Sequence, residues 1–369
     1  MKVAIVHDWL TGMGGAEKVV IDLHKIFPNA PIYTSVVNYE KIDPIFKEMD
    51  IRTTFIQKLP FSKKKYNRYL PLFPIAFESL DLSEYDLILS STTSIGAKGV
   101  LRNSSSIHIC YCNTPPRYTW DFYHEYLASA GRMQRIAIPI LMHYLRTYDQ
   151  LSSNRVDYYI ANSTNVKERI SKIYNKSSTV IHPPVDVEYY QPETVTDDTD
   201  DYYIIVSRLV SYKRVDLAIE ACNKLNKNLI VIGHGEEFEK LKQLSGPTIT
   251  LLGYQTDEQI KVYMQKSKAF LFPGFEDFGI APVEAQACGK PVIAYGKGGA
   301  LDTVLPEKTG VLFNEQTVDA LCEAIQKFET MKFSSQEIRQ HAENFSQKNF
   351  SQKILEFIES SMEINRTML

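Results

Sequence analysis

Two series of short apolar segments, each followed by a helical pattern, run through this chain of 369 residues. The β-rich segments of the first half are Val3–Val6, Ile32–Ser35, Leu87–Ser90, Ile107–Tyr111 and Tyr158–Asn162. Those of the second half are Tyr202–Ser207, Asn228–Gly233, Thr248–Leu252, Ala269–Phe272 and Pro291–Ala294. Helical patterns occupy Ala16–Ile26, Thr164–Tyr174, Val215–Asn226 and Gln259–Lys266. This alternation predicts parallel α/β layers, and the length leaves room for two cores.

An acidic run separates the two series. Residues 193–201 read Glu-Thr-Val-Thr-Asp-Asp-Thr-Asp-Asp and contain few apolar anchors, which is typical of a linker. Because both halves restart with strand, loop and helix, we expect two Rossmann-like domains, 1–192 and 193–348, that face a cleft. The C-terminal stretch 349–369 carries a helical apolar pattern at Ile354, Phe357, Ile358 and Met362.

Composition and charge narrow the class of protein. The net charge of −3 gives no argument for a nucleic-acid partner. No stretch reaches the roughly 20 apolar residues of a membrane span, and the N-terminus lacks the apolar length of a signal peptide. The five cysteines form an odd, scattered set that indicates reduced thiols. We therefore expect a cytoplasmic protein that meets a membrane, if at all, peripherally on its inner face.

A glycine-rich loop follows the first predicted strand and opens a helix. It reads Gly12-Met-Gly14-Gly15. Glycines let the backbone approach a phosphate, and the N-terminus of a helix offers free N–H groups. The alternative is a plain strand-to-helix turn, because the spacing is not that of a dinucleotide-binding fingerprint.

Basic residues and two further glycines follow the first strands of the second half. Arg208 and Lys213 lie on a loop that enters a helix, where a guanidinium and an ammonium suit the oxygens of a diphosphate. The alternative is a solvated basic face. Gly233 and Gly235 permit a tight turn at which a base or phosphate can lie against the backbone.

Two glutamates flank the fourth predicted strand-to-helix loop of the second half. Glu276 lies on the loop, and Glu284 is expected in the first turn of a helix opened by Pro282. Both then face the carboxyl edge of the sheet, where α/β proteins bind ligands. The backbone between them belongs to Phe278, Gly279, Ile280 and Ala281. Two carboxylates beside backbone N–H groups suit a ligand with many hydroxyls, although glutamates also occur at helix ends for structural reasons.

This run resembles the E-x7-E signature of retaining glycosyltransferases with the GT-B fold, family four. The resemblance implies that Glu276 holds a hydroxyl of the transferred sugar and that Glu284 accepts from the ribose hydroxyls of the nucleotide. It also implies that Arg208 and Lys213 stabilise the departing diphosphate. Gly14 and Gly15 match a Gly-Gly loop of the same family, and the last helix is expected to pack back on the first domain.

A second constellation lies on the loop after Ile107–Tyr111. The run Tyr-Cys-Asn113-Thr-Pro-Pro-Arg117-Tyr118-Thr-Trp-Asp121 is similar to the Y-C-H-T-P-x-R-Y-x-W-D run of mannosyltransferase-like members that use GDP-mannose. Those members carry histidine where this chain has Asn113, which forms hydrogen bonds but holds no proton charge near neutral pH. Arg117 is expected to pair with an acceptor phosphate or with Asp121.

The resemblance implies sugar transfer from a nucleotide diphosphate sugar, with mannose from GDP-mannose favoured, to a glycan acceptor. A lipid-diphosphate-linked acceptor of bacterial polysaccharide, O-antigen or lipopolysaccharide assembly is expected. No Asp-x-Asp motif occurs at a suitable place, so no metal or other cofactor is predicted. The alternatives are a UDP-sugar donor, an epimerase or hydrolase of the same fold, and a non-catalytic protein that binds sugar nucleotides.

A basic and aromatic stretch at residues 58–77 suggests a lipid partner. Its basic residues are Lys63, Lys64, Lys65 and Arg68, and they alternate with Phe61, Tyr66, Tyr69, Leu72 and Phe73. Anionic membrane surfaces attract such stretches. The alternative is that the lysines are solvated while the aromatic rings belong to the core.

Overall fold

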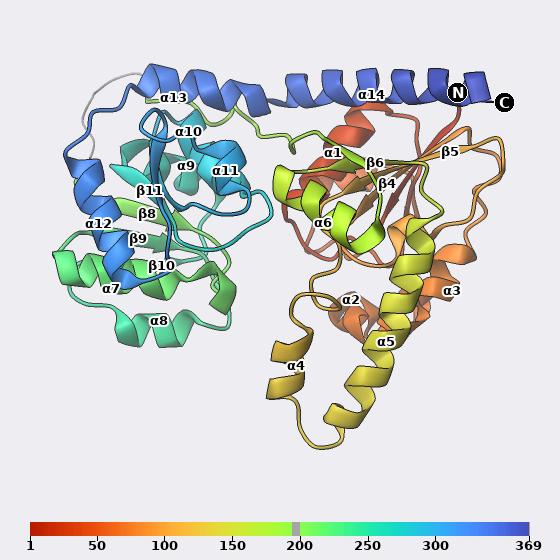
Figure 1. Ribbon diagram of the computed structural model, residues 1–369, viewed down its shortest axis with the longest axis horizontal. Coiled ribbons are helices and arrows are strands. Elements are labelled where there is room, and N and C mark those ends of the chain that lie inside the picture. The colour runs from red at the N-terminus through yellow and green to blue at the C-terminus, as the bar shows by residue number, and fades with distance from the viewer. Residues whose placement is uncertain (194–199, 369) are drawn as a thin grey trace. The chain divides into compact units, whose positions relative to one another are not determined.

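The computed structural model describes residues 1–193 and 200–368 and shows an α/β protein. The chain forms two compact units: unit one contains Met1–Pro183 and the stretch from Phe350 onward, and unit two contains Pro184–Asn349. Each unit has its own parallel sheet with helices on both faces, which confirms the predicted fold class (Figure 1). Most of the predicted acidic linker, residues 194–199, lies outside the described residues.

Unit one is built on a seven-stranded sheet in the order β3-β2-β1-β4-β5-β6-β7. Its strands are β1 (Val3–His7), β2 (Ile32–Thr34), β3 (Ile51–Thr53), β4 (Leu87–Thr92), β5 (Ile107–Cys112), β6 (Tyr158–Ala161) and β7 (Ser178–Val180). β4 and β5 are buried along their whole length, as expected in a parallel sheet. The strand order reverses between β1 and β4, so their carboxyl ends form a topological switch point.

Unit two is built on a six-stranded sheet in the order β10-β9-β8-β11-β12-β13. Its strands are β8 (Tyr203–Val206), β9 (Leu229–Ile232), β10 (Ile249–Gly253), β11 (Ala269–Phe272), β12 (Val292–Tyr295) and β13 (Gly310–Phe313). Here the order reverses between the neighbouring strands β8 and β11. The loops that follow these two strands therefore lie side by side at the carboxyl edge.

Helices bury both faces of the sheet in unit one. On one face, α1 (Gly15–Ile26) and α14 (Gln347–Met368) contribute to a single apolar cluster. On the other face lie α3 (Phe73–Glu78), α5 (Gln134–Ser153) and α6 (Thr164–Tyr174). The short helices α2 (Ser62–Lys65) and α4 (Tyr123–Ser129) complete the unit. In Figure 1, α4 and the first turns of α5 extend beyond the sheet of unit one.

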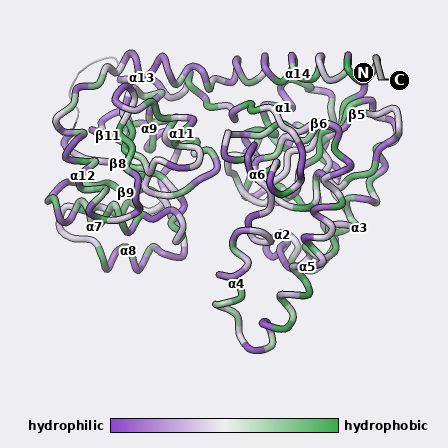
Figure 2. Tube along the Cα trace, viewed as in Figure 1, coloured by the Kyte–Doolittle hydropathy of each residue, from purple (hydrophilic) through white to green (hydrophobic). Residues whose placement is uncertain are grey.

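Unit two has the same layered plan. One face of its sheet carries α7 (Val215–Leu225), α8 (Phe238–Leu244) and α12 (Val318–Glu329). The other carries α9 (Asp257–Lys266), α10 (Ile280–Ala287), α11 (Ala300–Thr303) and α13 (Ser335–Ala342). Hydrophobic colouring occurs on the strands of both sheets in Figure 2, and also on parts of the helices that cover them. Among the described residues, no helix combines the length and the apolar character needed to cross a membrane.

The C-terminal helix belongs to the first unit, as the resemblance implied. Phe350, Ile354 and Ile358 of α14 are buried in the same cluster as α1 and β1. At the other junction, unit one ends at Pro183 rather than at residue 192. The difference arises because Val185 and Tyr190 are buried in the core of unit two.

A buried histidine in β5 makes unit one sensitive to acid. His108 is fully buried, and its Nε2 lies 2.8 Å from the Ser90 hydroxyl. Burial, reinforced by the nearby charge of Arg102, lowers the pKa of His108 to about 3. Its folded pKa is therefore below the unfolded value of about 6.5, and the stabilisation present above pH 6.5 is lost as the pH falls towards 3.

We expect this histidine to remove about 2 kcal/mol from the free energy of unfolding of unit one between pH 7 and pH 5. Urea titrations followed by tryptophan fluorescence measure it, because both tryptophans of the chain, Trp9 and Trp120, lie in unit one. The variant His108→Gln should lose that part of the pH dependence, and the exposed His143→Gln should keep it. An unchanged slope in His108→Gln would show that another group titrates.

Candidate functional site

The switch point of unit two brings a basic and an acidic residue into contact. Lys213 lies on the loop after β8, and Glu276 lies on the loop after β11. The Lys213 ammonium forms an ion pair with the Glu276 carboxylate, and both side chains are mostly buried. Gly274 makes this approach possible, because a Cβ there would come within 2.9 Å of the Lys213 backbone. The sequence placed both residues at this edge but did not reveal their pairing.

Arg208 and Arg214 flank this pair in different ways. The Arg208 guanidinium donates a hydrogen bond to the Tyr212 hydroxyl at 2.9 Å. Arg214 pairs instead with Asp216 at 3.1 Å, so it has a structural partner. Arg208 and Lys213 both contact Tyr212, so they are the two candidate cations on this loop, whereas Arg214 has a structural partner.

The helix after Glu276 begins earlier than the sequence predicted. α10 starts at Ile280 instead of Pro282, with Gly279 as its N-cap and no capping side chain. Gly279 has φ +88, a conformation that glycine adopts readily. Glu284 consequently falls beyond the first turn, which contains no acidic residue, and it is 6% exposed. The uncapped end presents backbone N–H groups, including that of Ala281, with a partial positive charge.

Phe278 has a packing role in addition to its predicted place in the site. Its side chain is buried, and its ring lies 5.8 Å from that of Phe345, centroid to centroid. The core of unit two thus fixes the residue immediately before Gly279. This anchoring holds the start of α10 in place.

Gly233 and Gly235 lie on the loop after β9, where they allow two loops to pack. A Cβ on Gly233 would meet the carbonyl oxygen of Ser207 at 1.8 Å, and one on Gly235 would meet that of Leu209 at 2.1 Å. The backbone N–H of Leu209 donates to the carbonyl of His234 at 3.1 Å. The packing of the loop after β9 against the loop after β8 therefore explains both glycines without a ligand. The same packing places them beside the loop that carries Arg208.

The glycine-rich loop of unit one also lies at a switch point. Gly14 is the N-cap and Gly15 the first residue of α1, whose end has no capping side chain. Glu17, in the first turn, lies 3.7 Å from Nε2 of His7 at the end of β1. Burial alone would lower the pKa of His7, but Glu17, the charge of Asp8 and the hydrogen bond with Ser91 together outweigh it and raise the pKa. The sequence analysis did not predict the pair of His7 and Glu17. The available signal was a histidine at the end of an apolar strand.

Asn113 and the same histidine both contact Ser91. Its amide donates to the Ser91 hydroxyl at 3.0 Å and to the Thr92 carbonyl at 3.3 Å. His7 Nδ1 lies 2.9 Å from the carbonyl oxygen of Ser91. Ser91 thus connects Asn113, at the position where the resembling family has histidine, to a histidine on the neighbouring strand.

The other candidate acceptor residues are held by partners within unit one. Arg117 Nε lies 3.6 Å from the Asp121 carboxylate, which also pairs with Arg169 at 2.6 Å. The Tyr118 hydroxyl lies 2.7 Å from that of Ser94. Of the two interpretations of Arg117, the structural ion pair is the one observed.

Asp8 fixes the loop after β4, and sequence reasoning missed it as well. Its buried carboxylate accepts from the backbone N–H groups of Thr93, Ser94, Gly96 and Ala97 at 2.7 to 3.1 Å. Ser94, which Asp8 holds through its backbone N–H, also contacts the hydroxyl of Tyr118. Asp8 therefore helps to position the loop that carries Asn113 and Tyr118. Its role is to position this edge of the sheet.

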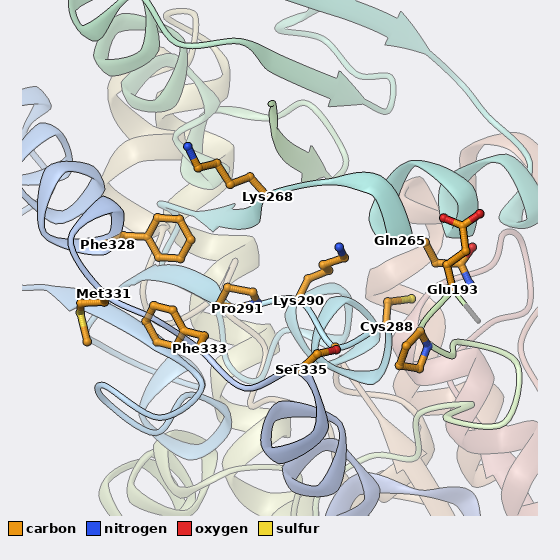
Figure 3. Close-up of a pocket in the computed structure, with 12 residues that line it drawn as sticks. Glu193, Gln265, Lys268, Cys288, Lys290, Pro291, Phe328, Met331, Phe333 and Ser335 are labelled. Carbon is orange, nitrogen blue, oxygen red and sulfur yellow. The ribbon is translucent and has the colours of Figure 1, made fainter. Parts of the chain in front are cut away.

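A pocket of about 260 Å³ lies elsewhere in unit two (Figure 3). Lys268, immediately before β11, and Lys290, two residues before β12, border it. It therefore lies at the amino edge of the sheet, whereas Glu276 follows β11 at the carboxyl edge. This pocket does not coincide with the candidate site, and the switch-point geometry is the stronger guide to ligand binding.

Comparisons with known proteins agree with this architecture. Residues 13–189 match the family Glycosyltransferase Family 4, and residues 186–352 match Glycosyl transferases group 1. The chain is 22% identical over 382 residues to an alpha-1,3/1,6-mannosyltransferase of Dictyostelium discoideum, covering 86% of this chain and 87% of that protein. It is 26% identical over 209 residues to a GDP-mannose-dependent alpha-(1-6)-phosphatidylinositol monomannoside mannosyltransferase of Mycolicibacterium smegmatis, covering 49% and 55%.

The fold is also that of a solved structure. Anabaena HepE in complex with UDP superposes with a TM-score of 0.72 at 18% identity, over 98% of this chain and 100% of that one. The chain spans only 52 to 58% of the length of several sequence relatives. The likeness therefore extends over the whole fold, while sequence similarity to those relatives is confined to about half of their length.

Proposed function

Since this chain belongs to the family-four glycosyltransferases with the GT-B fold, we propose that it moves a hexose from a nucleotide diphosphate sugar to a glycan acceptor with retention of configuration. Unit two, with Lys213, Glu276 and the start of α10, would hold the donor. In unit one, Gly14 and Gly15 are proposed to bind the donor, and the loop from Asn113 to Asp121 would hold the acceptor.

The ion pair of Lys213 and Glu276 at the switch point is the observation that carries this proposal. When a diphosphate enters, the ammonium has an anionic partner, and Glu276 is released to accept from a sugar hydroxyl. In the reaction, the bond between the anomeric carbon and the phosphate oxygen breaks, and the acceptor oxygen forms the new bond on the same face. The acceptor proton passes to the leaving phosphate, whose charge Lys213 and Arg208 stabilise.

Mannose from GDP-mannose is the favoured donor. Two of the relatives are mannosyltransferases, and the name of one specifies GDP-mannose. The loop from Asn113 to Asp121 supports the same donor through its resemblance. A UDP-sugar is the second candidate, because the superposed HepE structure holds UDP. Asn113 bears on this choice, since it replaces the histidine of the resembling mannosyltransferases.

The acceptor is proposed to be a lipid-diphosphate-linked glycan of bacterial polysaccharide assembly, and the reaction to need no metal. Arg208 and Lys213 can supply the positive charge that a divalent cation would otherwise give to the leaving diphosphate. Two alternatives remain. The protein could bind sugar nucleotides without catalysis, or it could be an enzyme of another kind, an epimerase or a hydrolase.

Calorimetric titration with GDP, UDP, GDP-mannose and UDP-sugars, with and without magnesium, tests the donor assignment. We expect one nucleotide family to bind equally well in magnesium and in EDTA. The variant Glu284→Ala should bind about 10 to 100 times more weakly, because it loses charge-assisted hydrogen bonds to ribose hydroxyls. Glu239→Ala, an exposed glutamate of α8, should bind like the native protein.

The outcomes separate the candidate functions. Binding of no nucleotide would overturn the donor site, and binding that requires magnesium would overturn metal independence. If a nucleotide sugar binds, product analysis with a panel of glycan acceptors follows. Release of free sugar without transfer would indicate a hydrolase, and binding without turnover would indicate a non-catalytic protein.

A further inference from the structure

Helix α5 carries an apolar stripe that faces solvent. Met133, at its N-cap, is 87% exposed, Ile136 is 72% exposed and Ile140 is 71% exposed. Tyr144, 43% exposed, continues the same line. Residues at these spacings share one side of a helix. Figure 2 shows hydrophobic colouring along this part of α5, which Figure 1 places beyond the sheet of unit one.

The stripe is separate from the face that packs on the unit. Leu145 is buried in the cluster of α3, and Leu141 and Met142 pack against that cluster. These contacts turn the stripe outwards. Large exposed apolar side chains in one line are unusual on a protein surface and indicate a contact with a membrane or another protein.

The charge around the stripe has one sign. Between Glu125 and Asp149 the sequence contains no acidic residue. The same interval holds Arg132, Arg135, His143 and Arg146, of which Arg135 and Arg146 donate to the carbonyls of Ala130 and Thr119. An apolar stripe next to Arg132, in an interval without an acidic residue, fits an anionic lipid surface, where the stripe enters the acyl boundary and the cation remains among headgroups.

The basic stretch 58–77 adjoins this helix. The Tyr144 hydroxyl donates to the carbonyl of Pro71 at 3.4 Å. Within this stretch Phe73 is fully buried and Tyr66 and Tyr69 are half-buried, so most of its rings belong to the core. The lysines remain exposed, as does Phe61 at 74%. Residues 58–77 thus present charge together with the exposed side chains of Phe61 and Ile75, and α5 supplies the longer apolar stripe.

We propose that the exposed stripe of α5, together with the lysines at 63–65, docks unit one on an anionic lipid bilayer. The same helix is joined to the loop of the candidate acceptor site. Asp149 accepts from Trp120 Nε1 at 2.8 Å, and Arg146 donates to the carbonyl of Thr119 at 2.9 Å. A bilayer that holds α5 therefore holds the Asn113 loop near its surface, where a lipid-linked acceptor is presented. This last step rests on the proposed function, whereas the docking does not.

Co-sedimentation of the full chain with vesicles tests the proposal. Vesicles of phosphatidylcholine with 30 mol% phosphatidylglycerol, on the order of a bacterial anionic content, are compared with pure phosphatidylcholine. We expect binding to the anionic vesicles that weakens as salt is raised. Ile136→Gln with Ile140→Gln should lower the partition coefficient roughly tenfold or more, since glutamine keeps the helix but not the apolar contact. Replacing Lys63, Lys64 and Lys65 by glutamine should lower it roughly a hundredfold.

Val262→Gln with Leu355→Gln, exposed aliphatic side chains on α9 and α14, is the matched control and should leave partitioning unchanged. Circular dichroism verifies that each variant is folded. The proposal is overturned if the native protein does not bind anionic vesicles. It is also overturned if the variant Ile136→Gln with Ile140→Gln partitions like the native protein. A dimer in light scattering that the α5 variant converts to a monomer, without vesicle binding, would assign the stripe to a second copy. Nucleotide titration of the same samples shows independently whether the donor site is intact.

Discussion

Replacing Lys213 with alanine is expected to lower kcat for sugar transfer by about 10²- to 10³-fold, the usual effect of removing one preorganised charge from a developing anion. The ammonium is held against Glu276 at the switch point, which is where the proposed function puts the charge of the leaving diphosphate. Because this charge grows as the glycosidic bond breaks, kcat should fall more than KM rises. Initial rates with the donor identified by titration measure both constants.

Arg214→Ala is the matched control for this variant. Arg214 is the next residue in the chain and is also basic, but it pairs with Asp216 and not with the site. We expect its rate to stay within about twofold of the native rate, since a partly exposed ion pair contributes little. Equal losses in the two variants would show that net charge, and not the position of Lys213, supports catalysis. In the double variant Lys213→Ala with Glu276→Ala the losses should not add, because the residues are in contact.

Replacing Lys98 with methionine is expected to lower the free energy of unfolding of unit one by about 3–5 kcal/mol. Lys98 and Asp149 form an ion pair in which both side chains are fully buried. Asp149 also accepts from Trp120 and from the Tyr174 hydroxyl at 3.1 Å. Without Lys98, two hydrogen bonds remain to a buried carboxylate that has lost its counter-charge.

Urea unfolding monitored by tryptophan fluorescence measures this loss directly, since Trp120 contacts Asp149. Lys2→Met provides the control, because Lys2 pairs with Glu84 in an exposed ion pair of the same unit, and little change is expected. Adding Asp149→Leu to Lys98→Met should restore part of the stability by removing the orphaned charge. A single variant as stable as the native protein would contradict the buried pair, and additive losses in the double variant would contradict its coupling.

The sequence predicted the layers of both units because their central strands are continuous apolar runs. Ala269–Phe272 and Thr164–Tyr174 were predicted with the bounds that the structure shows. Of the four rim strands, β10 was predicted but β3, β7 and β13 were not. β3 and β7 have three residues each and no buried side chain, so they lack an apolar signal, whereas β13 is mostly buried. Helix α5 was missed as well, since Pro139 lies inside it and proline normally indicates a helix end.

The site was predictable to the level of the sheet edge but not to the level of contacts. Residues that follow parallel strands must gather at one edge, which is why Arg208 and Glu276 were placed correctly on their loops. Which carboxylate Lys213 meets depends on Gly274, whose missing Cβ admits the neighbouring loop. The role of Asp8 was also hidden, because its partners are backbone N–H groups that no sequence pattern displays.

The return of α14 to unit one determines the order in which this chain can complete its first domain. A ribosome completes residues 1–183 and the whole of unit two before it makes Phe350, Ile354 and Ile358, which belong to the first core. The core of unit one therefore stays incomplete, with the apolar face that α14 covers exposed, while unit two is synthesised. Recombination between related genes meets the same constraint. A crossover that exchanges only the first half of the gene combines the sheet of unit one from one protein with the helix α14 of the other. A viable chimera would need to exchange the two ends of the gene together.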